Sequence, residues 1–269
     1  MTGSASPLIA VDVGNTRIKL GLFAPAEVDG APVCREFAAV PRSGAPPWAL
    51  LHRWAGGATL PTVIGGSHPA IIEQWERDWA IQRWPAPEVI RRRSSIPVEV
   101  DVDVPDRVGL DRLLNAVAAR FYRPADQPAI IVDAGTAVTV DYVSRDGRFC
   151  GGAILPGLSL GARALHSYTA LLPLLGPEEL RGESPAALGR NTQAAMKSGL
   201  RWGLAGAVRE LIAKISAEKG SEGPPCLFLT GGDGSLLTET FPEARCFPSL
   251  AMHGLVFCVR NGQGGIVAA

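Results

Sequence analysis

The sequence predicts an α/β protein that consists of two similar halves. The first observation is a pattern that occurs twice, DVGNT at 12–16 and DAGTA at 133–137, each time at the end of an apolar, strand-like run. The second is an amphipathic helical pattern that precedes the second copy, and the third is the polar, Pro-containing segment 122–128 between them. One motif used twice in 269 residues favours two halves over one large domain.

In the first half, an apolar run at 8–13, a Gly-Asn-Thr turn and an alternating segment at 17–23 predict a β-hairpin. A further strand is expected at 61–66. It precedes a predicted helix whose apolar side chains recur at helical spacing: Ile71, Ile72, Trp75 and Trp79. A second helix carries the apolar stripe Leu110, Leu113, Leu114, Val117 and Phe121. The segment 24–60, rich in Pro, Gly and Ala, predicts no element.

In the second half, an apolar run at 129–132, an Asp-Ala-Gly-Thr turn and an alternating segment at 138–140 predict another hairpin. The helix that follows Asn191 carries a stripe of small residues at every fourth position: Ala195, Gly199 and Gly203. Such a stripe permits close approach of another helix, either inside the core or across a dimer.

The composition excludes several classes of protein. Hydrophobic residues make up 46% and charged ones 19%, which suits a packed core and not a disordered chain. The 26 basic and 26 acidic residues balance, which argues against nucleic-acid and membrane-surface partners, since both require basic excess. Five cysteines form no CxxC pair, and Asp12 interrupts the first apolar run. We therefore expect a cytoplasmic protein with reduced thiols and no membrane partner.

The two Asp-x-Gly turns suggest polyphosphate binding. A Gly turn between strands exposes backbone N–H groups, and Thr hydroxyls add donors, so the turn can form an anion cradle. A carboxylate at the strand end, such as Asp12, suits Mg²⁺ held through water, and Lys19 adds a positive charge. Either turn alone could be a plain β-turn, but the repetition favours phosphate binding. Neither the common NTPase loop nor the Rossmann fingerprint occurs.

These hairpins resemble those of the superfamily of acetate and sugar kinases, heat-shock chaperone ATPases and actin. Within it, the chain resembles the type III pantothenate kinase family along most of its length. The motifs that carry the resemblance stand in the family's order: DVGNTRIK (12–19), GLDR (109–112), DAGTAVT (133–139), GGAILPG (151–157), TALLP (169–173), NTQAAMKSG (191–199) and TGG (230–232).

The resemblance implies two actin-like (ribonuclease H-like) α/β domains with a central nucleotide cleft. Domain 1–124 would carry the first phosphate motif and the substrate and base motif. Domain 125–269 would carry the second phosphate motif and the adenosine motif. The implied reaction is ATP-dependent phosphorylation of pantothenate to 4'-phosphopantothenate, the first step of coenzyme A biosynthesis, in a homodimer that binds pantothenate and ATP.

The resemblance also implies roles for individual residues. The ATP contacts would be Asp12, Val13, Gly14, Asn15, Thr16, Arg17, Ile18, Lys19 and Thr136. The pantothenate contacts would be Val102, Gly109, Leu110, Asp111, Arg112 and Thr192. Asp111 would be the catalytic base, Asp12 would hold Mg²⁺ through water, and Asp133 would bind a monovalent cation, K⁺ or NH₄⁺.

Two of these residues have a simpler interpretation, and one departs from the family pattern. Asp111 opens a predicted helix, where a carboxylate is favoured by the helix dipole, so it could merely cap that helix. Thr192 also stands at a helix start and could be a cap. Val102 occupies a position where the family usually has Tyr facing pantothenate, so that contact is expected to be absent.

Three rival functions start from other observations. Ser159 lies in a G-x-S-x-G pattern, and Asp233 and His253 follow in the chain order of α/β-hydrolase triads. That hypothesis leaves both Asp-x-Gly turns and the GLDR segment unexplained. A non-catalytic regulator on the kinase scaffold is the second rival, against which stand the retained carboxylates at 12, 111 and 133. A sugar kinase is the third, and GLDR and NTQAAMKSG argue against it.

Overall fold

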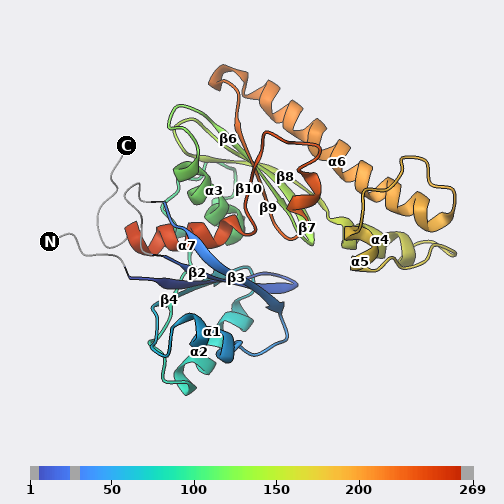
Figure 1. Cartoon of the computed structure of the whole chain (residues 1–269). Coiled ribbons are helices and arrows are strands. Elements are labelled where there is room, and N and C mark those ends of the chain that lie inside the picture. The colour runs from blue at the N-terminus through green and yellow to red at the C-terminus, as the bar shows by residue number, and fades with distance from the viewer. Residues whose placement is uncertain (1–5, 25–30, 262–269) are drawn as a thin grey trace. The chain divides into compact units, whose positions relative to one another are not determined.

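A computed structural model of the chain describes residues 6–24 and 31–261 (Figure 1). The chain forms two compact units, one made of Met1–Ala125 with Ser249–Ala269 and the other of Asp126–Pro248. Each unit contains one five-stranded sheet and its own helices. Among the described residues, no helix combines the length and the apolar character needed to cross a membrane.

The first unit contains a sheet in the order β3-β2-β1-β4-β5. Its strands are β1 (Leu8–Val13), β2 (Arg17–Phe23), β3 (Cys34–Pro41), β4 (Thr62–Gly66) and β5 (Glu88–Val89). Its helices are α1 (Trp48–Trp54), α2 (Pro69–Ile81), α3 (Leu110–Tyr122) and α7 (Leu250–Asn261), with short 3₁₀ turns η1 (Arg93–Ser95) and η2 (Pro105–Arg107).

The two faces of the first sheet are covered by different helices. All six residues of β1 are buried, and alternate side chains point to opposite faces. Ile9, Val11 and Val13 pack into one cluster with the Trp75 and Trp79 side chains of α2. Asp12 therefore points to the other face, on which α7 packs against β1 and α3 (Figure 1).

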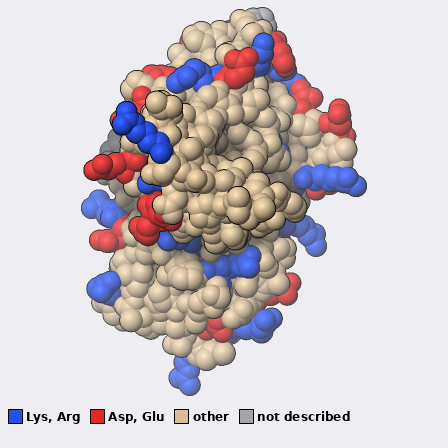
Figure 2. All heavy atoms as spheres, turned by 90° about the vertical axis from the view of Figure 1, so that its right-hand side faces the viewer, with Lys and Arg blue, Asp and Glu red and all other residues tan. Residues whose placement is uncertain are grey.

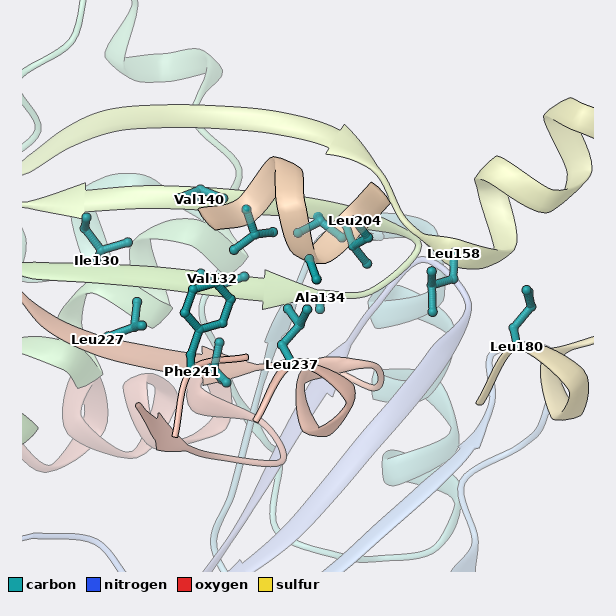
Figure 3. Packing of buried hydrophobic residues seen from close by; sticks show 14 of the residues in the cluster. Ile130, Val132, Ala134, Val140, Leu158, Leu180, Leu204, Leu227, Leu237 and Phe241 are labelled. Atoms are coloured by element: carbon teal, nitrogen blue, oxygen red, sulfur yellow. The ribbon is translucent and has the colours of Figure 1, made fainter. Parts of the chain in front are cut away.

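The second unit contains a sheet in the order β10-β9-β6-β7-β8. Its strands are β6 (Ala129–Ala134), β7 (Ala137–Val143), β8 (Phe149–Pro156), β9 (Cys226–Thr230) and β10 (Arg245–Cys246). Its helices are α4 (Leu158–Ser167), α5 (Pro177–Arg181) and α6 (Thr192–Glu218), with 3₁₀ turns η3 (Gly220–Glu222) and η4 (Gly234–Leu237). Figure 3 shows its core, in which side chains such as Val132, Val140 and Leu204 pack together.

The two sheets have the same topology, which confirms the prediction of two similar α/β halves. In each, the first strand pairs antiparallel with the second and parallel with the fourth strand of its sheet. Asp12 pairs with Lys19 across the first hairpin, and Asp133 pairs with Thr139 across the second. Each Asp therefore lies near the end of the central strand of its sheet, directly before the turn.

The domain boundaries expected at the carboxyl end of the chain were wrong. The segment from Ser249 onward belongs to the first unit and not to the second, because α7 packs against β1, β4 and α3. The packing is close: a Cβ added to Gly254 would lie 2.1 Å from the carbonyl oxygen of Leu114 in α3. The predicted hairpins and helices were confirmed, whereas the segment 24–60, for which no element was predicted, contains β3 and α1.

Candidate active site

The first Asp-x-Gly turn joins β1 and β2 and is closed by its own backbone. The N–H of Gly14 donates to the carbonyl of Arg17 at 3.1 Å, and a Cβ at Gly14 would lie only 2.9 Å from that oxygen. The side chain of Arg42 donates to the carbonyl of Asn15 at 2.6 Å, which fixes the outer side of the turn. The side chains at 15–17 are exposed, so this turn presents them to solvent.

The carboxylate of Asp12 is buried next to this turn, with 5% of the residue exposed. Its Oδ2 atom lies 3.5 Å from the Nζ of Lys19 and accepts a hydrogen bond at 3.3 Å from the hydroxyl of Ser249. A carboxylate, an ammonium and a hydroxyl thus converge at the end of β1. Val13 and Ile18 on either side are fully buried in the core, so only their backbone can contribute to a ligand site.

The second Asp-x-Gly turn joins β6 and β7 and is pinned from outside. The N–H of Gly135 donates to the carbonyl of Ala137 at 3.0 Å, as in the first turn. Gly157, which precedes α4, donates its N–H to the carbonyl of Thr136 at 3.0 Å. A Cβ at Gly157 would lie 2.1 Å from the carbonyl oxygen of Gly135, so only glycine fits against this turn. The side chain of Thr136 is exposed.

A glycine pair lies at the end of the strand that runs parallel to each central strand: Gly65-Gly66 are the last residues of β4, and Gly231-Gly232 directly follow β9. Gly66 has φ +138° and Gly231 has φ +89°, and a Cβ at either would overlap the backbone of Val13 or Ala134. The next N–H groups donate back to these strands, that of Ser67 to Val13 and that of Asp233 to Ala134, both at 2.9 Å. The TGG motif of the second unit was predicted from the sequence, whereas the Gly65-Gly66 pair of the first unit was missed. The repeated Gly-Gly after an apolar run is the signal that could have revealed it.

The GLDR motif lies at the start of α3, in the same unit as the first turn. Gly109 is the N-cap, and Asp111 is the second residue of the helix. The Oδ1 of Asp111 accepts a hydrogen bond at 2.9 Å from the N–H of Arg112, and a Cβ at Gly109 would lie 2.5 Å from that oxygen. Asp111 and Arg112 are half-buried, as is Val102 in the segment before the helix. Leu110 is the first residue of α3.

Thr192 lies at the start of α6 but does not cap it. The N-cap is Asn191, whose side chain accepts from the N–H of Ala194 at 2.9 Å. Thr192 is exposed and lines a groove of about 870 Å³ between α4 and α6. The groove also passes Ala195 and Gly199, and a Cβ at Gly199 would meet nothing within 4 Å. The small-residue stripe of α6 therefore faces open space and not the core.

The serine-hydrolase hypothesis requires Asp233 as the acid and His253 as the base, and the structure shows both residues in contact with other side chains. Asp233 forms an ion pair with Arg181 of α5 at 2.6 Å. The Nδ1 of His253 lies 2.6 Å from the hydroxyl of Tyr122, which donates to the carbonyl of Pro32. Both residues are buried, and each is engaged within its own unit. Ser159 is the second residue of α4, whose N-cap is Gly157.

His253 gives the first unit a pH-dependent stability. Burial lowers the pKa of His253 from 6.5 to about 4, so the folded chain keeps the imidazole neutral where the unfolded chain protonates it. The unfolded state therefore binds more protons between pH 6.5 and 4. We expect the free energy of unfolding to fall as the pH is lowered through this window, by on the order of 3 kcal/mol in total.

Denaturant titrations at pH 7 and pH 4.5 measure this effect. His253→Gln should flatten the pH dependence, because glutamine has no proton to gain. His166→Gln is the matched control, since His166 is exposed, and it should keep the dependence of the wild type. Equal slopes for the wild type and His253→Gln would contradict the prediction.

Comparison with solved structures defines the class of fold. A protein from Campylobacter jejuni assigned to the Baf family of transcriptional activators matches with a TM-score of 0.58 at 16% identity, over 95% of this chain and 98% of that one. The activator of 2-hydroxyisocaproyl-CoA dehydratase from Clostridium difficile, with bound ADPNP, matches with a TM-score of 0.52 at 12% identity, over 98% and 99%. Both matches extend over nearly the whole of each chain, so the two proteins share the two-sheet α/β fold described above.

Comparison with sequences defines the family. The family model for type III pantothenate kinase matches residues 8–214. Type III pantothenate kinases from Gluconobacter oxydans and Caulobacter vibrioides are 43% and 36% identical over 66% and 65% of this chain. These alignments span 63% and 65% of the two relatives, under two thirds of their length. The type III pantothenate kinase from Moorella thermoacetica is 33% identical to this chain, and the alignment covers 92% of this chain and 96% of the relative. The chain belongs to the type III pantothenate kinase family.

Proposed function

We propose that this protein transfers the γ-phosphoryl group of ATP to the hydroxyl of pantothenate, the first step towards coenzyme A. The observation that carries the proposal is the family match over 8–214, which includes both Asp-x-Gly turns and GLDR. The geometry supports it, because each turn is a closed backbone loop at the end of a central strand. Nothing in the family match favours a hydrolase, a sugar kinase or a non-catalytic regulator.

The proposed ATP contacts belong to the two phosphate motifs. The first would contribute the backbone of 13–18 together with the side chain of Lys19, and the second would contribute Thr136. Asp12 fits Mg²⁺ held through water, since a buried carboxylate at a strand end is a hard oxygen ligand with a fixed position. Asp133 occupies the equivalent place in the second unit and fits a monovalent cation. When bound, Mg²⁺ would neutralise charge on the phosphate oxygens.

Asp111 would orient the pantothenate hydroxyl and accept its proton. The carboxylate lies in the first turn of the 13-residue helix α3, where the helix dipole favours the ionised form. Phosphoryl transfer has a loose transition state, so an ordinary carboxylate at the correct position is a sufficient base. Arg112 and the backbone of Gly109 would bind the substrate. Val102 would leave space where relatives usually place an aromatic ring.

We also propose that the protein works as a homodimer through the second unit. Figure 2 looks onto α4, α5 and α6 and shows a broad surface with few charges around a hollow. Large apolar side chains are exposed in this unit: Ile154, Leu160, Tyr168, Leu171, Leu174, Leu188 and Trp202. Apolar surface of this extent favours association.

Sedimentation velocity should show a species of twice 28.3 kDa, and a monomer at assay concentrations would contradict the dimer.

The cytoplasm is the proposed location, and the reduced cysteines Cys34, Cys150, Cys246 and Cys258 support it because thiols suit a reducing compartment. A panel of phosphoryl acceptors tests the substrate assignment. ADP release should require pantothenate, and N-acetylglucosamine or water should not replace it. Faster ADP release with a sugar than with pantothenate would favour the sugar-kinase alternative.

A further inference from the structure

Ser249 is a buried residue that contacts the proposed Mg²⁺ ligand from the far end of the chain. It is 1% exposed, and its hydroxyl donates to the Oδ2 of Asp12 at 3.3 Å. It belongs to none of the sequence motifs that point to ATP or pantothenate. Ser249 is also the first residue of the segment that returns to the first unit.

The fold holds Ser249 in place from one side. The next residue, Leu250, is fully buried and begins α7, which packs on β1 and α3. The close approach of Gly254 to Leu114 leaves α7 little room to shift along α3. The hydroxyl of Ser249 therefore has a fixed position relative to β1 and to Asp12.

The second partner of Asp12 is less constrained. Lys19 keeps 19% of its side chain exposed, and its ammonium carries three donors on a flexible stem. An arriving polyphosphate competes with Asp12 for that ammonium. Ser249 is 1% exposed, so we expect its hydrogen bond to Asp12 to remain when Lys19 turns to phosphate.

We propose that Ser249 is a positioning residue, which holds the Asp12 carboxylate in one orientation for the Mg²⁺ that accompanies the nucleotide. This inference rests on the proposed function, since it needs Asp12 to serve bound Mg²⁺ and nucleotide. It adds a residue outside the recognised motifs, 237 positions away from Asp12 in the sequence.

Calorimetric titration with a non-hydrolysable ATP analogue tests the proposal, with Mg²⁺ and with EDTA. Ser249→Ala should weaken binding of the Mg²⁺ complex about tenfold, the scale of a hydrogen bond to a charged group. Binding in EDTA should be unchanged. Ser249→Thr keeps the hydroxyl and should bind as the wild type does, whereas Ser249→Cys, a weak donor of similar size, should lose affinity. If Ser249→Ala fails to fold, comparing Ser249→Thr with Ser249→Cys still tests whether a hydroxyl at this position is needed to bind the Mg²⁺ complex.

Ser144→Ala is the matched control, because Ser144 is a buried serine that donates to the carboxylate of Asp146 in the β7–β8 turn. It should bind the Mg²⁺ complex as tightly as the wild type. Unchanged binding by Ser249→Ala, or an equal loss with Mg²⁺ and with EDTA, would overturn the proposal. A wild type that binds the Mg²⁺ complex but phosphorylates no pantothenate would contradict the proposed function alone, because the Ser249 comparison uses binding.

Discussion

Asp111→Asn is expected to lower kcat for pantothenate phosphorylation by a factor of about 10²–10⁴, the usual contribution of a general base. The amide fills the same volume but cannot accept the hydroxyl proton. The N–H of Arg112 can still donate to the amide oxygen, so the start of α3 should keep its structure. We therefore expect the Kd of ATP to stay within about twofold of the wild type, since Asp111 is not among the proposed nucleotide contacts.

Steady-state kinetics and nucleotide titration measure both quantities. Asp106→Asn is the matched control, because Asp106 is an exposed carboxylate in the nearby turn η2. It should keep kcat near the wild-type value. Full activity of Asp111→Asn would remove the base assignment and leave Asp111 as a residue that only stabilises the start of α3.

Gly157→Ala is expected to lower kcat/KM for ATP by about 10²-fold. The added Cβ would lie 2.1 Å from the carbonyl oxygen of Gly135 and 2.8 Å from that of Thr136, so the turn or the start of α4 must move. A displacement of about 1 Å of a group that positions the substrate can lower the rate by about 10²-fold. The same overlap should reduce the free energy of unfolding by about 1–3 kcal/mol, as overpacking does in other cores.

Gly206→Ala separates this effect from the general cost of adding a methyl group. A Cβ at Gly206, in the middle of α6, would meet nothing within 4 Å. Alanine there should leave kcat/KM unchanged and raise stability by about 0.5–1 kcal/mol, because it restricts the unfolded chain and favours helix. Wild-type kinetics for Gly157→Ala would show that the second turn does not need its present position.

The sequence predicted the hairpins and the helix at GLDR because each has a local signal. Both central strands begin with four apolar residues and lead directly into Asp-x-Gly, and α3 carries a continuous apolar stripe. The strand β3 has no such signal, since it is an edge strand with most side chains outside the core. A strand without an apolar face does not show the alternation on which prediction depends.

The parts of the candidate site that escaped prediction depend on distant contacts. The apolar composition of α7 indicates a buried helix but does not say which sheet covers it, and the helix lies in the first unit. Gly157 stands in a recognised motif, yet its role against Gly135 appears only in three dimensions. Ser249 has no motif at all. Such pairings are set by packing over long separations, which local propensity does not encode.

Phosphoryl transfer to pantothenate by the purified protein is the direct test of the proposed function. The purified protein is incubated with ATP, Mg²⁺ and pantothenate, with and without K⁺, and the products are identified by mass spectrometry and ³¹P NMR. We predict 4'-phosphopantothenate and ADP in equal amounts, with a higher rate in K⁺. Absence of phosphorylated pantothenate in both conditions, from a protein that is folded and binds ATP, would rule out the proposed kinase activity.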